Sequence, residues 1–278
     1  MLGILIGARS TISPELQMAF QRTGTSHLVA LSGFNITIIA IAISWMLSGF
    51  HLSSRAKLMI SAASVTLFVL LVGGGASVVR AAIMGILALI ARERGRIYEM
   101  TNALLFAAIV MILINPYLLR FDLSFQLSFL ATLGIIIMPP KLESWLLWSA
   151  KESGIAEILY ATLGAELFVF PLILWQFGRV SLIGPLANLL VLPLIPFTML
   201  LGFLVGVLGM IAPSLAYILA WVGHLLTSYE LGVIKLLSAF PGSSATLPKV
   251  FTWIATLPAV YFAIVYIKDR FRYVRLAK

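Results

Sequence analysis

Long apolar runs, separated by short polar connections, make up most of the chain. A helix needs about 20 apolar residues to cross the roughly 30 Å hydrocarbon core of a bilayer. Charged residues, prolines and glycines bound the runs and mark the ends of the expected helices. The pattern predicts about nine spans, at 28–50, 57–72, 77–91, 101–119, 121–138, 155–177, 181–211, 214–239 and 250–267. The expected fold is therefore all-α, a polytopic transmembrane helical bundle.

Glycine and proline predict that some of these helices are broken. Three consecutive glycines separate the second span from the third, and glycine in a helix interior is destabilising. The seventh run is too long for one straight helix and contains prolines, which interrupt helical hydrogen bonding. We expect it to be broken, kinked or partly re-entrant, which membranes tolerate only inside protein or beside water. The expected helix breaks are at Gly73, Gly74, Gly75, Pro193 and Pro196.

Composition indicates that the bilayer is the solvent for most of the chain. Hydrophobic residues make up 61% of it and charged residues 10%, and the mean hydropathy is +1.08. Soluble domains carry about 25% charged residues, so a soluble globular fold is excluded. The spans leave no room for a sizeable soluble domain, and residues 1–278 are interpreted as a single integral-membrane domain.

The net charge of +9 is distributed unevenly. A basic chain can contact the phosphates of nucleic acid or of anionic lipid, but cytoplasmic loops are also enriched in Lys and Arg. With the N-terminus outside, twelve of the nineteen Lys and Arg fall in inward-facing loops and the tail, and five fall outside. This bias favours nine passes, an extracytoplasmic lead-in at 1–26 and a basic cytoplasmic tail at 268–278.

Ten polar or charged residues lie within the predicted membrane depth. A lone charge at the bilayer centre costs at least about 2.5–3.5 kcal/mol, so each such group needs a partner or water. An aqueous or tightly paired interior is therefore expected. The residues are Asn35, Arg80, Asp122, Gln126, Glu166, Gln176, Asn188, His224, Glu230 and Lys235.

Arg80 and Glu166 are the most informative of these residues. Arg80 follows the glycine run, where it can face a cavity and bind an anionic group such as a phosphate. Alternatively, it reaches the outer headgroups from near its helix end. Glu166 has no charge within a turn of it, which favours an ion pair with Arg80 or Lys235 over a protonated, hydrogen-bonding or proton-relay carboxyl. Glu230 and Lys235 are expected on an exposed amphipathic face.

The sequence lacks the usual patterns of catalytic and metal-binding chemistry. It contains no cysteine, and its three histidines form no His-x-His or His-Glu-x-x-His arrangement. A Gly-x-Ser-x-Gly nucleophile motif is also absent. We therefore expect no enzyme activity, no metal and no cofactor.

Several stretches of the chain, in the same order, are similar to the signatures of one bacterial family. The first two resemble its His-Leu-Leu-Ala-x-Ser-Gly-Leu-His-Val and Ser-x-x-Arg-Ala-x-x-Met signatures. The third resembles its Phe-Gln-Leu-Ser-Phe box, and the last its Asn-Leu-Leu-x-x-Pro element. The stretches are His27–Ile36 (HLVALSGFNI), Ser77–Met84 (SVVRAAIM), Phe125–Phe129 (FQLSF) and Ala187–Pro193 (ANLLVLP). The chain thus resembles the membrane-channel domain of the ComEC-type competence proteins.

The resemblance implies a channel that carries single-stranded DNA across the bacterial inner (cytoplasmic) membrane in natural transformation. It implies the lipid bilayer as surroundings and a DNA receptor, a nuclease and a cytoplasmic helicase as partner proteins, and it is compatible with a homo-oligomer. On the positions that match, the DNA path is expected at His27, Ser32, Gly33, Asn35, Arg80, Gln126, Glu166 and Asn188.

The chain departs from that family in three respects. The OB-like and metallo-β-lactamase-like domains that relatives carry are not part of this sequence, so nuclease activity is not expected of it. Asn35 stands where the family signature has a second histidine, which removes a titratable group. Glu166 stands where many relatives have glutamine, and a negative charge there needs neutralisation in a DNA path.

Two other functions fit parts of the pattern. A small-solute secondary transporter also uses broken helices and a buried carboxylate such as Glu166. An intramembrane enzyme would need a nucleophile and base pair, which the sequence does not offer. The DNA channel remains the leading hypothesis because the family resemblance favours it.

Overall fold

Helices account for almost all of the ordered secondary structure, as the sequence predicts. The computed structural model describes residues 13–29, 36, 43, 47, 49, 51–146, 154–248 and 250–276. Its helices are α2 (Pro14–Arg22), α3 (Ser26–Val29), α5 (Ser54–Val72), α6 (Ala76–Glu93), α7 (Met100–Ile114), α8 (Leu118–Phe121), α9 (Leu123–Leu146), α10 (Gly154–Phe177), α11 (Gly184–Val191), α12 (Ile195–Ile211), α13 (Pro213–Ser238) and α14 (Phe251–Leu276). Two short strands, β1 (Arg179–Ser181) and β2 (Ser244–Thr246), pair antiparallel.

The predicted count of about nine spans is not confirmed. Within the described residues, five single helices are long and apolar enough to cross a membrane: α5, α9, α10, α13 and α14. The pair α11–α12 adds a sixth span if its two parts cross together. α7 has 15 residues and reaches only about 22 Å, because a helix rises about 1.5 Å per residue. The first predicted span, 28–50, lies mostly outside the described residues.

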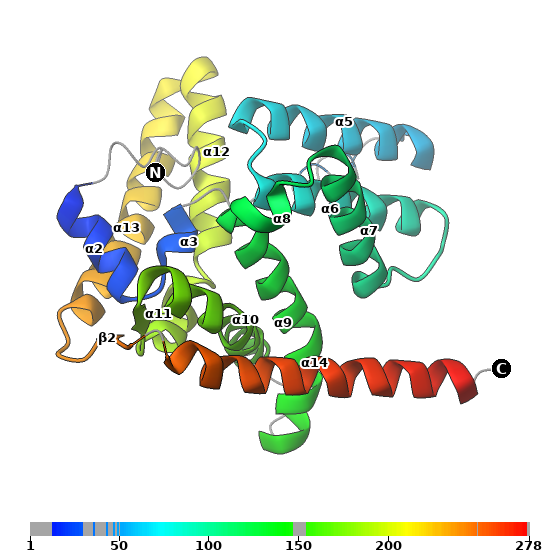
Figure 1. The fold of residues 1–278 in the computed structure, drawn as a ribbon. Helices are drawn as coiled ribbons and strands as arrows, with labels where there is room; N and C mark the ends of the chain where they lie inside the picture. Colours follow the sequence, from blue (N-terminus) through cyan, green and yellow to red (C-terminus); the bar gives the residue numbers. More distant parts are fainter. Residues whose placement is uncertain are drawn as a thin grey trace.

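The helices form two groups that a pair of packed helices joins (Figure 1). The α5–α8 group packs on α9, and the α11–α13 group packs on α2. Between the groups, α9 and α10 make the most extensive helix contact in the described part of the chain. α14 crosses the lower part of α9 in Figure 1 and packs there through Phe262 against Ile137 and Phe168.

The α9–α10 pair is in contact through its backbones. A Cβ atom added to Gly164 would lie 2.7 Å from the carbonyl oxygen of Gly134, and one added to Gly134 would collide with the carbonyl of Gly164. Small residues allow this close approach between helices in lipid, where dispersion contacts rather than the hydrophobic effect drive association. Glu166 follows Gly164 two residues later on α10, so this crossing places the stretch of helix that carries it.

Helix breaks occur near the glycines and prolines that the sequence singles out. Gly73 and Gly74 have left-handed backbone, with φ of +89° and +64°, and they separate α5 from α6. Pro193 lies between α11 and α12, whose axes differ by 47°. Pro196 lies in the first turn of α12, where a missing N–H leaves no helical hydrogen bond unmade.

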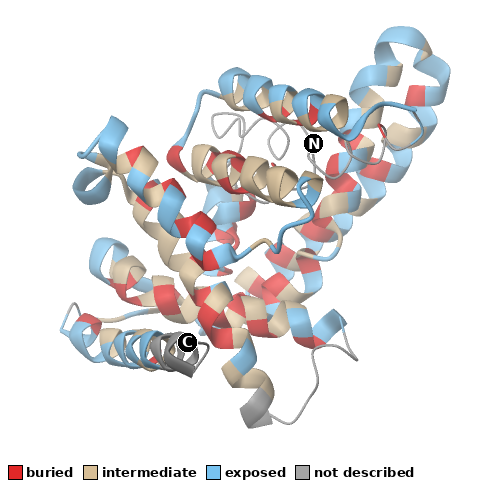
Figure 2. Ribbon diagram, turned by 90° about the vertical axis from the view of Figure 1, so that its right-hand side faces the viewer, coloured by how far each residue is buried: buried red, intermediate tan, exposed pale blue. Residues whose placement is uncertain are grey.

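Exposed residues cover the outward faces of the helices (Figure 2), and many of them are large and apolar. On α5, Leu70 and Leu71 are 72% and 76% exposed, and Met210 on α12 is 89% exposed. Soluble proteins rarely expose apolar surface on this scale. These faces are therefore the lipid-facing surface of a membrane protein, and buried residues lie along the inner faces.

Candidate functional site

A carboxyl group and an amide meet where α10 packs on α11. The Asn188 Nδ2 donates a hydrogen bond of 3.2 Å to Glu166 Oε1. Asn188 is 4% exposed, and its Oδ1 is buried without a partner within the described residues. The expected ion pair between Glu166 and a cation is wrong within that part of the chain, because the only partner found for Glu166 is this amide.

Two glycines bring backbone close to this contact. A Cβ atom on Gly184, the first residue of α11, would lie 2.8 Å from Glu166 Oε1. A Cβ atom on Gly24 would lie 3.1 Å from the Ser181 Cβ and 3.6 Å from the Gly184 Cα, and Gly24 has a φ of +68°. We call Gly24, Ser181, Gly184, Glu166 and Asn188 the carboxyl–amide cluster. It joins the N-terminal helices to α10 and α11.

His27 lies beside this cluster. Its Nδ1 is 3.2 Å from the carbonyl oxygen of Gly24. The turn before it is held by the buried hydroxyls of Thr23 and Thr25, whose Oγ1 atoms are 2.8 Å apart. Ser181 Oγ also donates to the Arg22 carbonyl at 2.8 Å. The fold thus brings the His27 stretch next to Glu166 and Asn188, although about 140 to 160 residues separate them in sequence.

Arg80 lies in a different region, in the second turn of α6. Its Nε is buried without a partner, and no hydrogen bond or ion pair to its guanidinium is found among the described residues. Tyr98, in the connection between α6 and α7, is close enough to interact with it electrostatically. Burial raises the pKa of Tyr98, and the positive charge of Arg80 opposes that rise. Arg80 is therefore a partly buried cation that the described fold does not neutralise.

Gln126 holds a turn. Its Nε2 donates to the backbone carbonyl oxygens of Leu119 and Arg120 at 2.9 and 3.1 Å, which ties α9 to the end of α8. Asp122 Oδ1 accepts a hydrogen bond of 2.8 Å from the Phe125 N–H and caps the start of α9. The Gln126 amide therefore satisfies carbonyl groups that the short helix α8 leaves open.

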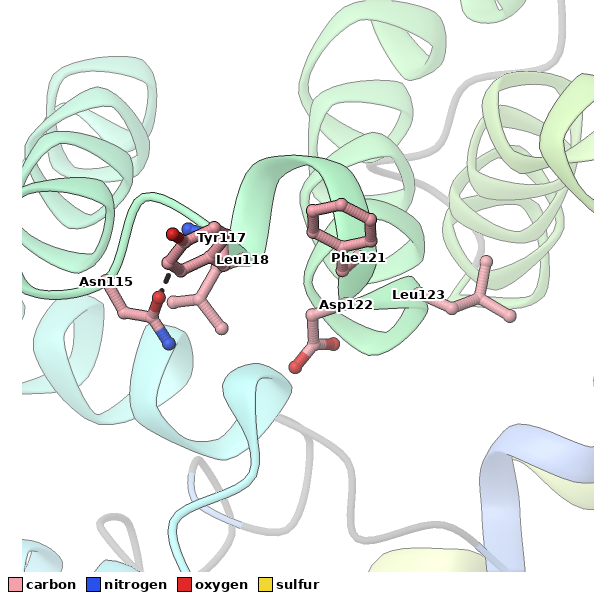
Figure 3. Close-up of a pocket in the computed structure, with 6 residues that line it drawn as sticks. All are labelled: Asn115, Tyr117, Leu118, Phe121, Asp122 and Leu123. Carbon is pink, nitrogen blue, oxygen red and sulfur yellow. Dashed lines mark hydrogen bonds between the residues drawn. The ribbon is translucent and has the colours of Figure 1, made fainter.

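Two open pockets lie in the α5–α9 region. The first, of about 360 Å³, surrounds the α7–α8–α9 corner (Figure 3) and is lined by Asn115, Tyr117, Leu118, Phe121, Asp122 and Leu123. The second, of about 330 Å³, is lined by Leu87, Ala91, Ile97, Tyr98, Glu99, Asn102, Ala103 and Phe106. Tyr98 connects the second pocket to the surroundings of Arg80. Neither pocket is lined by Glu166, Asn188, Gln126 or Arg80 itself.

The predicted site residues therefore form no single constellation. Glu166 and Asn188 meet in the carboxyl–amide cluster and His27 contacts its Gly24, whereas Arg80 and Gln126 lie in two other places. Ser32, Gly33 and Asn35 lie outside the described residues, so their relation to Arg80 is not defined.

The sequence prediction is wrong for one buried carboxyl group, that of Glu230. Glu230 is 2% exposed, so the prediction of an exposed face is wrong for it, although Lys235 is exposed. The sequence contains a signal for this, because small and apolar residues share the helical spacing of Glu230 on α13, and these positions are buried. This stripe of buried positions is Ala216, Gly223, Thr227, Glu230, Ile234 and Leu237.

Comparison with known proteins identifies the family. The competence protein family matches residues 4–271, which is nearly the whole chain. The chain belongs to the competence protein family. Among curated competence proteins, ComE operon protein 3 of Bacillus subtilis (strain 168) is 26% identical over 250 residues. That match covers 86% of this chain but only 31% of the relative, so the chain spans about a third of the relative's length. No solved structure gives a significant match.

The family match and the fold both indicate a membrane protein. The apolar helices with their exposed apolar faces make this competence-family chain a multi-pass membrane protein. The stretches that resemble the family signatures all lie within the matched range.

Proposed function

We propose that this chain forms part of the membrane channel through which single-stranded DNA crosses the bacterial inner membrane in natural transformation. The family match over residues 4–271 supports a role in competence. In this proposal the N-terminus is outside, the C-terminal basic tail is cytoplasmic, and the chain itself catalyses no reaction. A DNA receptor, a nuclease and a cytoplasmic helicase act with it, and several copies can assemble.

The proposal depends on the surroundings of Arg80. A cation at membrane depth costs at least about 2.5–3.5 kcal/mol unless a partner or water compensates it. No partner is found for its guanidinium among the described residues, and its Nε is buried. A DNA phosphate provides the missing charge and acceptor oxygens, and arginine binds phosphate through two parallel hydrogen bonds. Tyr98 and the pocket beside it supply an aromatic surface, which suits an unpaired base.

Glu166 and Asn188 receive a different role in this proposal. A carboxylate that faced the DNA strand would repel its phosphates, but Glu166 is engaged by the Asn188 amide. We assign the carboxyl–amide cluster to holding α11 in place before the break at Pro193, and Gln126 to holding the α8–α9 turn. Contact with DNA is assigned to Arg80.

The test is uptake of labelled DNA by cells whose only copy of the gene carries Arg80→Ala. We expect uptake to fall about tenfold or more, because a hydrogen bond to a charged group contributes about 1.5–3 kcal/mol. Arg80→Lys should retain part of the uptake, since lysine keeps the charge but loses the bidentate geometry.

Arg120→Ala is the matched control. Arg120 is exposed and its guanidinium lies 5.5 Å from the Phe121 ring centroid, in the same half of the molecule. Its removal should leave uptake unchanged. Wild-type uptake by Arg80→Ala cells with normal protein levels would contradict the role assigned to Arg80.

A secondary transporter of small solutes is the second candidate. It is favoured by the position of Glu166 beside the broken span α11–α12, because transporters place coupling groups at such breaks. In that case Glu166→Gln would abolish solute uptake driven by a pH gradient and leave transformation intact. Loss of transformation in Arg80→Ala cells, with no solute transport by the purified chain in vesicles, would exclude it.

A further inference from the structure

A carboxyl group that is fully buried lies on the other side of the helix break from Glu166. Glu230 on α13 is 2% exposed, and its Oε1 is 2.6 Å from the Thr198 Oγ1 on α12. The same Thr198 Oγ1 is 3.2 Å from the carbonyl oxygen of Leu194. Leu194 immediately precedes α12, at the break between α11 and α12. A continuous chain of polar atoms therefore runs from α13 to the break.

The number of protons available to this series of hydrogen bonds shows which group must donate each one. A threonine hydroxyl carries one proton, and a backbone carbonyl oxygen can only accept. Threonines in helices commonly donate that proton to the carbonyl four residues earlier, which is Leu194 here. The short contact between Thr198 and Glu230 then needs a second proton, and only the Glu230 carboxyl group can supply it.

The alternative is an ionised Glu230 that accepts the threonine proton. A 2.6 Å contact alone does not exclude it, because hydroxyl-to-carboxylate bonds are typically 2.5–2.7 Å long. The second carboxyl oxygen of Glu230 favours the protonated form. Glu230 Oε2 is buried and has no partner within the described residues. A buried carboxylate with an unpaired oxygen costs several kcal/mol unless a cation compensates it.

No described cation faces Glu230. α11 and α12, which pack against α13, contain no Asp, Glu, His, Lys or Arg. The remaining ionisable groups of the described elements that pack around Glu230 are all exposed at the surface. They are Glu15 and Arg22 on α2, His27 on α3, and Tyr217, His224, Tyr229 and Lys235 on α13 itself.

We propose that Glu230 is a proton-binding site. As a neutral carboxylic acid it donates to Thr198 Oγ1, and Thr198 donates to the Leu194 carbonyl. The bound proton thereby ties α13 to the break in α11–α12. Loss of that proton removes one of these two hydrogen bonds and places a negative charge between the tightly packed helices α12 and α13. This site is independent of the proposed DNA path, because neither Arg80 nor the carboxyl–amide cluster takes part in it.

The experiment is infrared spectroscopy of the purified chain in lipid nanodiscs at neutral pH. The wild-type spectrum should contain the carbonyl stretch of a protonated carboxylic acid, and Glu230→Gln should remove that band. Glu157→Gln, which changes an exposed carboxyl group on α10, should leave the band in place. Glu166→Gln separates any contribution of Glu166. An unchanged band in Glu230→Gln would overturn the proposal.

Thermal unfolding gives a second readout on the same variants. Glutamine has the shape of a neutral glutamic acid and can donate to Thr198, so Glu230→Gln should keep the wild-type Tm or raise it. Thr198→Val removes both hydrogen bonds and should lower the Tm. If Glu230→Gln fails to fold or unfolds at a much lower temperature, the ionised carboxylate is required and the proton site is refuted.

Discussion

The α5–α8 group and the α11–α13 group treat their buried polar residues differently. In the α5–α8 group, Arg80 has no partner among the described residues. In the α11–α13 group, Asn188 contacts the partly buried carboxyl group of Glu166 and Thr198 contacts the buried carboxyl group of Glu230, one on either side of the helix break. Buried polar groups with partners specify structure, whereas an unpaired one needs an explanation outside the fold. Arg80 is therefore the residue at which we propose contact with DNA, whereas we propose that the contacts of Asn188 and Thr198 position helices.

The largest loss of stability is expected for a substitution at the α9–α10 crossing that joins the two groups. Gly164→Ala places a Cβ atom against the Gly134 carbonyl, and the backbone must move. Overpacking of this kind costs about 1–3 kcal/mol and occasionally more. The measurement is thermal unfolding of the purified chain in detergent. Gly85→Ala on α6 is the control, because nothing lies within 4 Å of its added Cβ, and it should be neutral or stabilising.

The next largest loss of stability is expected for a substitution in the carboxyl–amide cluster. Asn188→Leu leaves the partly buried Glu166 carboxyl group without its donor, which costs about 1–3 kcal/mol. Unfolding of the single variant, of Glu166→Gln and of the double variant forms a double-mutant cycle. We expect a coupling energy between the two residues that is clearly different from zero. A zero coupling energy would show that the hydrogen bond contributes nothing to stability.

A smaller loss of stability is expected for Gln126→Ala. The change removes hydrogen bonds to two backbone carbonyl groups at the end of α8, and a loss of about 1 kcal/mol follows. DNA uptake should stay near the wild-type level once protein amounts are equal. A specific loss of uptake with unchanged stability would instead place Gln126 in the DNA path and weaken the division between the two groups.

The smallest change in stability is expected for Arg80→Leu, in the opposite direction. Replacing an unpaired, partly buried cation with a shorter apolar residue should leave the Tm unchanged or raise it, although DNA uptake is lost. Stable proteins often carry such a cost at functional sites. A marked fall in Tm for Arg80→Leu would mean that the guanidinium has a structural partner, and the comparison between the two groups would fail.

The helices could be predicted from sequence more reliably than their partners. The runs of apolar residues correspond to α5, α6, α7 and α9–α14, because lipid imposes a simple length rule on each run. The predicted fourth span fails as a single helix. Asn115 and Pro116 end α7, and the remaining residues turn into the short helix α8. The pattern of hydrophobicity alone cannot show this turn, because the residues on both sides of it are apolar.

The partners of buried polar groups depend on contacts between helices far apart in sequence. Glu166 was assigned a cation because charge balance suggested one, but the nearest available donor is an amide on the adjacent α11. Glu230 was grouped with Lys235, which lies near it in sequence but on another face of the helix. Its identification as a buried residue required the stripe of buried positions rather than local charge.

The glycine crossing between α9 and α10 also restricts how the molecule can change shape. Two backbones in direct contact cannot slide or roll past one another without first separating, because no flexible side chains lie between them. We therefore expect the pair to move as one unit, so that a change of shape would rotate the flanking helices relative to it.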